Sequence, residues 1–280
     1  MALLRAYIAL MKLRVVELLL ISTIPAMILA EKGVPSLGLI AATLVGGTLA
    51  AGSANAFNMV LESDLDRLME RTVNRPLVTG ALSKTHAAVF ASVIGAASLL
   101  IFWVFTEPLA TLLTAVAIAF YVIVYTMALK RHTSQNIVWG GAAGCMLVFI
   151  GWAAVAFFFV IFFWTPPHFW ALAIKYKDDY EAAKIPMLPV IAARTIVLRN
   201  MWLHTIAMII SSVALIYLAE LQWWAMAITV ALGLVFAIQL LQLKENSEIY
   251  NAIALKIFHW SITYLTLFSA LLVAAQLLKA

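Results

Sequence analysis

Long apolar runs, separated by short polar segments, recur along all 280 residues of the chain. A helix needs about 20 predominantly apolar residues to cross the hydrocarbon core of a bilayer. None of the runs shows the period-two alternation of apolar and polar residues that a membrane barrel requires. The pattern therefore predicts an all-α polytopic membrane protein, with one domain over residues 1–280 forming a bundle of nine transmembrane helices around a central cavity. The predicted spans are 14–30, 37–60, 86–105, 108–128, 136–155, 157–174, 198–219, 221–243 and 256–278.

The composition agrees with this prediction. The chain is 65% hydrophobic and 11% charged, and its mean hydropathy of +1.03 is too high for a water-soluble domain of this length. Glu17 lies inside the first predicted span. It suits a catalytic support, a buried hydrogen-bonded acid and a helix-contact residue equally well.

The positions of lysine and arginine predict the orientation in the membrane. With a cytoplasmic N-terminus, sixteen of the 18 lie in cytoplasmic segments and only Lys32 and Lys279 lie outside. An odd number of spans then places the C-terminus outside, in a multi-pass protein of the cell (inner) membrane. The net charge of +5 reflects this bias, so we expect no nucleic-acid partner.

The segment "NMVLESDLDRLMERTVNRPLVTG", residues 58–80, carries acidic residues that membrane topology does not need. Asn58, Glu62 and Asp66 are spaced four apart, and each such step turns a helix by only about 40°. Their oxygens therefore form one stripe, which suits Mg²⁺ shared with a diphosphate. Asp64 points to the other side of the helix, where we expect it to be solvated or ion-paired.

Arg71 and Arg75 follow the stripe and are again four residues apart. Guanidinium groups match phosphate oxygens bidentately, so this pair is a candidate diphosphate clamp. The simpler alternative is a charged loop held by internal pairs of Asp66 or Glu70 with these arginines.

A second charged segment, "KYKDDYEAAKIPMLPVIAAR" at 175–194, has a similar composition. Asp178 and Asp179 lie about 100° apart on a helix, so one of them is expected to face a metal. Lys175 and Asp179 alternatively form a surface ion pair. Two acidic segments on the same side favour a shared site, because carboxylates at a membrane are costly to retain without a role.

The stretch "FFWTPPHFWALAI", 162–174, places two prolines and His168 inside an apolar span. Pro166 and Pro167 predict a broken or kinked helix whose free carbonyls line a cavity. Beside Trp164 and Trp170, His168 suits either a core position or a wall facing a large flat ligand.

These residues resemble the intramembrane prenyltransferases of the UbiA superfamily, and among them the protohaem IX farnesyltransferases. The superfamily pattern N-x-x-x-D-x-x-x-D, followed by R-T-x-N-R-P, matches Asn58, Glu62 and Asp66 and then residues 71–76, with glutamate at the middle position. "NIVWGGAAGCM", "GWAAV", "WTPPHFWALAIKYKDDY" and "IPMLPV" are similar to more specific stretches, so the likeness covers nearly the whole chain. The chain departs from the family in reading Met11-Lys12-Leu13-Arg14 for T-K-P-R, in lacking a polar loop after Val155, and in having Lys184 where glycine is common.

The resemblance implies transfer of farnesyl from farnesyl diphosphate to a vinyl group of haem B, with addition of water, in a Mg²⁺-dependent intramembrane enzyme. It implies association with the lipid bilayer and allows association with haem A synthase or terminal oxidase assembly. A quinone precursor or a chlorin is the alternative acceptor, and an organic-anion transporter is the alternative from another class. The implied metal-binding and catalytic residues are Asn58, Glu62, Asp66, Asp178 and Asp179, the implied diphosphate ligands are Arg71, Arg75, Lys130, Lys175 and Arg194, and the implied haem-binding residues are His168, Trp164 and Trp170.

Overall fold

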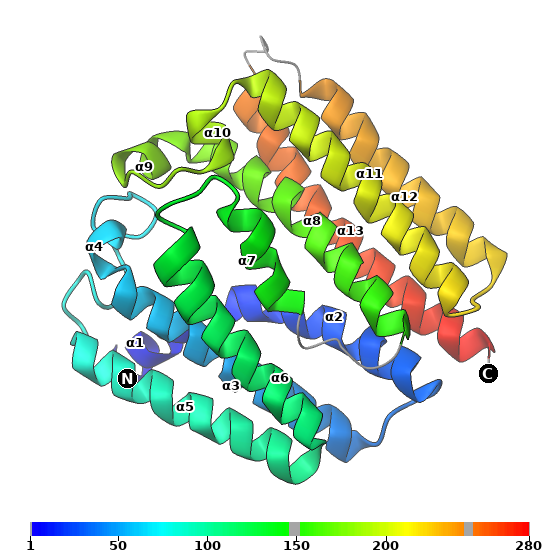
Figure 1. Cartoon of the computed structure of the whole chain (residues 1–280), viewed down its shortest axis with the longest axis horizontal. Helices are drawn as coiled ribbons and strands as arrows, with labels where there is room; N and C mark the ends of the chain where they lie inside the picture. The colour runs from blue at the N-terminus through cyan, green and yellow to red at the C-terminus, as the bar shows by residue number, and fades with distance from the viewer. Residues whose placement is uncertain (1, 146–151, 244–248, 280) are drawn as a thin grey trace.

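The computed structural model of the chain describes residues 2–145, 152–243 and 249–279. Every regular element in this part of the chain is a helix, and the long helices lie beside one another as a bundle (Figure 1). In chain order the elements are α1 (Ala2–Met11), α2 (Leu13–Glu31), α3 (Leu37–Leu61), α4 (Ser63–Asp66), α5 (Lys84–Phe105), α6 (Pro108–Ala119), the π-helix η1 (Phe120–Leu129), α7 (Asn136–Cys145), α8 (Trp152–Lys175), α9 (Lys177–Ala182), α10 (Leu188–Ile191), α11 (Arg194–Leu218), α12 (Trp223–Gln242) and α13 (Tyr250–Lys279).

Among the described residues, seven helical stretches are long and apolar enough to cross a membrane. Each overlaps one of the predicted spans, so the prediction of an all-α polytopic membrane protein is confirmed. The seven stretches are 37–66, 84–105, 108–129, 155–175, 194–218, 223–242 and 250–279.

The other two predicted spans are not among these seven. The span predicted at 14–30 falls in α2, a helix of 19 residues, and the side chain of Glu17 lies outside the described part. The span predicted at 136–155 begins as α7 and then enters residues 146–151, which also lie outside it. A total of nine spans stays a prediction.

Helix α8 corrects two expectations. It runs through Val155 into the following apolar stretch, so the helix boundary predicted between residues 155 and 157 is wrong. It also continues as α-helix through Pro166 and Pro167, where we expected a break or a kink, so the prediction of a break is wrong. Helices α2, α7, α11 and α13 all pack against α8 and support it from several sides.

The N-terminal half depends on close contact between α3 and α5. Ser98 donates a hydrogen bond to the carbonyl of Gly46 at 2.7 Å, and Ser53 donates to the carbonyl of Ala91 at 2.8 Å. A side chain at Gly95 would collide with Ser53. Small residues let membrane helices approach closely, so that dispersion and interhelical hydrogen bonds can hold them together.

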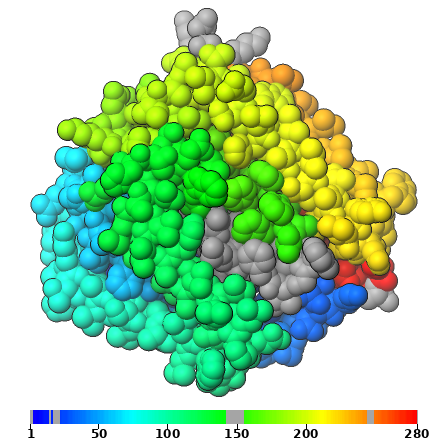
Figure 2. Space-filling model, in the orientation of Figure 1, coloured from blue at the N-terminus to red at the C-terminus, as the bar shows by residue number. Residues whose placement is uncertain are grey.

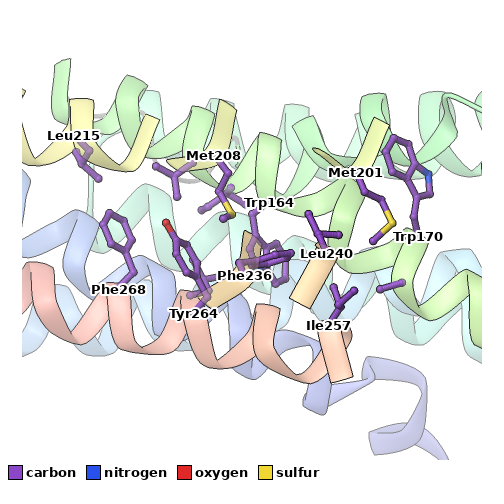
Figure 3. Packing of buried hydrophobic residues seen from close by; sticks show 14 of the residues in the cluster. Trp164, Trp170, Met201, Met208, Leu215, Phe236, Leu240, Ile257, Tyr264 and Phe268 are labelled. Carbon is purple, nitrogen blue, oxygen red and sulfur yellow. The ribbon is translucent and has the colours of Figure 1, made fainter. Parts of the chain in front are cut away.

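The C-terminal half has a core of large apolar side chains. Helices α8, α11, α12 and α13 enclose Trp164, Phe236, Tyr264 and Phe268, all at most 4% exposed (Figure 3). Tyr264 donates its hydroxyl hydrogen to Ser212 at 2.9 Å, which satisfies both buried groups. Helix α2 packs against α3 as well as α8 and α13, and so links the two halves.

The outside of the bundle is apolar, as a lipid-facing surface requires. Aromatic side chains gather where α5 ends and where α11 meets α12: Trp103, Phe105, Tyr217 and Trp223 are 63%, 64%, 72% and 80% exposed. Such residues mark membrane–water interfaces. Figure 2 shows one face of the molecule, on which η1 and α7 lie between the N-terminal and C-terminal segments. The short helices α4, α9 and α10 lie at the end of the bundle opposite to these aromatic residues (Figure 1).

Candidate functional site

The predicted stripe lies where α3 ends. Glu62 caps α3, and α4 begins at Ser63, so the stripe crosses a joint between two helices. Backbone bonding continues across this joint, because the N–H of Glu62 donates to the carbonyl of Asn58 at 3.0 Å and that of Asp66 donates to the carbonyl of Glu62 at 2.9 Å. The three side chains are therefore turned to one buried side, and their residues are 2%, 2% and 3% exposed.

Asp64 faces away from this buried side. Its side chain is 58% exposed and lies 2.9 Å from Arg131. The prediction that Asp64 is solvated or ion-paired is confirmed.

Each buried carboxylate of the stripe is paired with a cation from elsewhere in the chain. Nη1 of Arg75 lies 2.6 Å and 2.7 Å from the two carboxylate oxygens of Asp66. Nζ of Lys130, which follows η1, lies 2.5 Å from Oε2 of Glu62. The internal pair of Arg75 with Asp66 that we expected from the loop alternative is thus present, inside a larger cluster.

Lys12, which was not among the predicted site residues, completes the cluster. Its Nζ donates to Oδ1 of Asn58 at 2.9 Å. Lys12 forms the joint between α1 and α2 with a φ of +51°, in the left-handed region that residues other than glycine adopt at a cost. Asn55 fixes this joint by donating its side-chain amide to the carbonyl of Met11 at 3.0 Å, and a side chain at Gly52 would collide with Met11.

Lys12 is the most strongly perturbed group of this cluster. Burial, with the charges of Arg75 and Lys130, lowers the pKa of Lys12 well below its ordinary value, and Glu62 and Asp66 oppose this only in part. An added anion would favour the charged form of Lys12, so the cluster is suited to bind one.

The oxygens of the stripe fit a hard cation such as Mg²⁺. Oε1 of Glu62 is buried and has no hydrogen-bond partner, which is costly unless another group binds it. Asn58 and Asp66 offer amide and carboxylate oxygens on the same side. Within the described residues, no three Asp, Glu, His or Cys side chains are grouped to hold a metal alone. The arrangement therefore fits a metal that shares its ligands with a bound anion.

The second acidic segment meets the first. The carboxylate of Asp179, in α9, accepts hydrogen bonds from the backbone N–H groups of Glu70 and Arg71 at 3.3 Å and 3.2 Å. Asp178 is exposed to solvent. The structure thus brings both segments together, with Asp179 fixing the backbone of the loop that carries Arg71.

The other predicted diphosphate ligands lie near the surface. The guanidinium of Arg71 lies over two tyrosine rings of the α9 segment, 5.8 Å and 5.9 Å from their centres. Arg194, the first residue of α11, lies over the ring of Tyr250, the first residue of α13, at 4.5 Å. Lys175 is exposed at the end of α8, and the described side chains form four ion pairs that do not include Lys175 with Asp179.

His168 lies in α8 with both faces of its ring covered. Trp164 stacks on it at 4.3 Å and Phe258 at 4.6 Å between ring centres. Nδ1 of His168 lies 2.7 Å from Oγ of Ser261, and Nε1 of Trp164 donates to the carbonyl of Ser261 at 2.7 Å. The residue is only 6% exposed, and Phe169 also contacts the ring, at 5.0 Å between ring centres.

Trp170 lies on another side of α8, since two residues turn a helix by about 200°. It is 1% exposed, and its ring meets that of His204 edge to face at 5.2 Å, near Met201 (Figure 3). The structure therefore brings Trp164 to His168 but places Trp170 in the packing between α8 and α11.

Sequence reasoning missed three residues that contact the predicted ones. Lys12 donates to Asn58, and its charge indicated only membrane topology. Thr126 donates to a carbonyl of η1 and accepts from Asn58. Ser261 contacts His168 from α13. Spacing gave no signal for these contacts, because each joins residues more than 40 positions apart in the chain. The family likeness at Lys12 was the only available clue.

Comparison with known proteins agrees with this geometry. The UbiA prenyltransferase family model matches residues 19–262. A "Protoheme IX farnesyltransferase" of Paenarthrobacter aurescens is 49% identical over 275 residues, which cover 94% of this chain and 86% of the relative.

Two solved structures share the fold at low sequence identity. A digeranylgeranylglyceryl phosphate synthase has a TM-score of 0.79 at 13% identity, with 99% of both chains covered. A UbiA homologue from Archaeoglobus fulgidus, bound to GPP and Mg²⁺, has a TM-score of 0.68 at 18% identity, with 96% of this chain and 99% of the homologue covered. The fold, the family model and the relative agree, and the chain belongs to the UbiA prenyltransferase family, within which it groups with the protoheme IX farnesyltransferases.

Proposed function

We propose that this protein transfers a farnesyl group from farnesyl diphosphate to a vinyl group of haem B, with addition of water, to give haem O. The observation that carries the proposal is the buried cluster at the end of α3, where three oxygen-bearing side chains face Lys12, Arg75 and Lys130. The 49% identical relative named for protoheme IX farnesyl transfer supports haem as the acceptor.

The oxygen ligands of the proposed Mg²⁺ are Asn58, Glu62 and Asp66. Their support is the unpartnered Oε1 of Glu62 and the A. fulgidus homologue, which binds Mg²⁺ together with GPP. When bound, the metal would neutralise charge on the diphosphate. Asp178 stays a candidate further ligand, whereas the hydrogen bonds of Asp179 to the loop backbone favour a positioning role.

The cations of the cluster bind and stabilise the leaving group. As the bond between C1 of farnesyl and the diphosphate oxygen breaks, its electron pair leaves with the diphosphate. Lys12, Arg75 and Lys130 already lie beside the stripe, so they stabilise this charge without reorganising. Arg71, Lys175 and Arg194 lie further out, where they can attract the substrate.

The rest of the reaction needs an acceptor and dry surroundings. The haem vinyl group attacks C1 of the allylic cation and forms the new C–C bond. A water molecule then adds to the cation left on the former vinyl group and loses a proton, which gives the hydroxyethylfarnesyl substituent. The apolar helices protect the allylic cation from early hydrolysis, and no protein nucleophile is required.

His168 is the proposed contact to haem. The hydroxyl of Ser261 donates to the carbonyl of Phe258 at 2.6 Å, so its oxygen accepts the hydrogen of His168 Nδ1. Nε2 of His168 then keeps a free lone pair. Because Trp164 and Phe258 cover the ring faces, the Nε2 edge is the part of this histidine that haem can meet.

The orientation in the membrane is part of the proposal. The acidic stripe, Lys130 and α9 all lie at the end of the bundle that the positive-inside rule assigns to the cytoplasm. Lys279 pairs with Glu220 at 3.3 Å at the opposite end. We therefore propose a cytoplasmic active site, a cytoplasmic N-terminus and an external C-terminus.

Incubation of the purified protein with haem B, farnesyl diphosphate and Mg²⁺, followed by mass spectrometry of the porphyrin, tests the function. The expected product is haem carrying one farnesyl group and one added water, formed with Mg²⁺ and not with excess EDTA. A parallel reaction offers a quinone precursor and a chlorin. Unmodified haem together with a prenylated alternative acceptor would contradict the haem assignment and keep the family chemistry.

A further inference from the structure

The helix that carries Lys130 is wound more widely than its neighbours. Residues 120–129 form the π-helix η1, in which backbone bonds reach five residues back; the N–H of Lys130, for example, donates to the carbonyl of Tyr125 at 2.9 Å. Long π-helical stretches are rare, and π turns occur often at functional sites. The ring of Tyr125 occupies the space above Gly140 of α7, where a side chain would collide with it. The wide turns are thus built into the packing.

Thr126 makes a bond that an α-helix does not offer. Three other buried threonines in α-helices, Thr114, Thr165 and Thr229, each donate to the carbonyl four residues back; Thr114, for example, donates to Ala110 at 2.8 Å. Thr126 donates to the carbonyl of Tyr121, five residues back, at 2.9 Å. It is 1% exposed, so its hydroxyl has no water to bond instead.

The remaining lone pair of Thr126 fixes an amide of the candidate site. The hydroxyl hydrogen points to Tyr121, so Oγ1 accepts from Nδ2 of Asn58 at 3.3 Å. The other end of that amide, Oδ1, is thereby turned to Nζ of Lys12 at 2.9 Å. Loss of the Thr126 hydroxyl would remove the acceptor of this NH₂ group and leave the hydrogen bond from Lys12 to orient the amide.

We propose that Thr126 is a positioning residue, which uses the wide turn of η1 to hold the oxygen of Asn58 towards Mg²⁺ and the diphosphate. The inference rests on the proposed function, because it needs a metal at the stripe. It adds a residue that touches neither substrate nor metal and acts through Asn58.

The test uses Thr126→Val, which keeps the shape of the side chain and removes the hydroxyl. Thermal unfolding is followed in detergent while Mg²⁺ is titrated in the presence of inorganic pyrophosphate, so that binding is measured without turnover. Loss of a residue that hydrogen-bonds a metal ligand typically weakens metal affinity about 10-fold to 100-fold. We therefore expect the half-saturating Mg²⁺ concentration of Thr126→Val to rise about 10-fold. Thr126→Ser keeps the hydroxyl and should restore the wild-type Mg²⁺ requirement.

Thr114→Val is the matched control. Thr114 is a fully buried threonine of the preceding helix α6 and bonds to its own helix, so this variant should leave the Mg²⁺ midpoint unchanged. If Thr126→Val does not fold, Thr126→Ala takes its place. In the double variant with Asn58→Ala, loss of the Thr126 hydroxyl should add nothing, because the residue it positions is gone.

The outcomes separate the two proposals. A wild-type protein that Mg²⁺ and pyrophosphate do not stabilise would contradict the proposed function, and the inference with it. A wild-type response that Thr126→Val leaves unchanged, or an equal shift in Thr114→Val, would overturn the role of Thr126 alone. Additive losses in the double variant would also overturn it.

Discussion

The pair of Asp66 with Arg75 offers the sharpest test of the site. Asp66→Asn keeps the size of the side chain but removes its charge. In the wild-type protein, both carboxylate oxygens of Asp66 lie within 2.7 Å of Nη1 of Arg75, and the side chains of Asp66 and Arg75 are only 5% and 18% exposed. The variant therefore removes a proposed metal ligand and also leaves a mostly buried guanidinium without its anion.

The cost in stability follows from this burial. Exposed ion pairs contribute about 0.2–1 kcal/mol, whereas removing one partner of a buried pair costs about 3–5 kcal/mol. Arg75 keeps some contact with solvent, so we expect a loss of about 2–3 kcal/mol. At about 2–4 °C for each kcal/mol, this lowers the melting temperature by about 5–10 °C.

Two further variants separate stability from chemistry. In Asp66→Asn/Arg75→Gln the stranded charge is gone, so the melting temperature should return most of the way, since replacing both partners of a buried pair is often nearly neutral. Farnesyl transfer should stay more than about 100-fold below wild type, beyond the loss typical of an outer-layer partner. Asp64→Asn is the control, because its exposed pair with Arg131 is worth at most about 1 kcal/mol.

The assay combines melting curves in detergent with haem O formation measured by mass spectrometry at a temperature where every variant is folded. Equal losses of activity in Asp64→Asn and Asp66→Asn would show that the stripe does not define the site. Recovery of activity along with stability in the double variant would show that Asp66 serves the fold alone.

The remaining predictions concern the metal, a lysine, a histidine and a turn. Removal of Mg²⁺ with EDTA should abolish transfer and its return should restore it; activity that persists in EDTA would contradict a metal at the stripe. The folded-state pKa of Lys12 lies below its unfolded value, so between these two pH values the unfolded chain holds the extra proton and stability rises with pH. The melting temperature of wild type relative to Lys12→Met should therefore increase from neutral pH towards pH ~10. A difference in melting temperature that does not change with pH would refute the lowered pKa. His168→Ala should weaken haem binding, measured by absorbance, with little change in KM for farnesyl diphosphate, whereas unchanged haem affinity with a lower melting temperature would make His168 a packing residue. Lys184 has a φ of +53°, which costs a residue other than glycine about 1–2 kcal/mol, so Lys184→Gly should match or exceed wild type in melting temperature and Lys184→Ala should show no gain.

The length of the apolar runs by itself determined the class of the protein and most of its helices. A segment that crosses a membrane must be apolar along its whole length and must bond its own backbone, so composition and run length locate it without tertiary information. Where two helices meet inside one apolar stretch, this signal disappears. The boundary placed at Val155 was wrong for that reason, and packing around α8 overrode the expected break at its prolines.

The sequence also indicated much of the candidate site. Spacing of four residues was enough to predict that Asn58, Glu62 and Asp66 share a side and that Asp64 does not, because helical geometry is local. Only the tertiary structure decided which groups meet this stripe. Lys12 reaches the stripe from the joint between α1 and α2, and Thr126 reaches it from the π-helix η1, over separations of 46 and 68 residues from Asn58. Such contacts depend on how helices pack and on unusual backbone conformations, and neither leaves a periodic mark in the sequence.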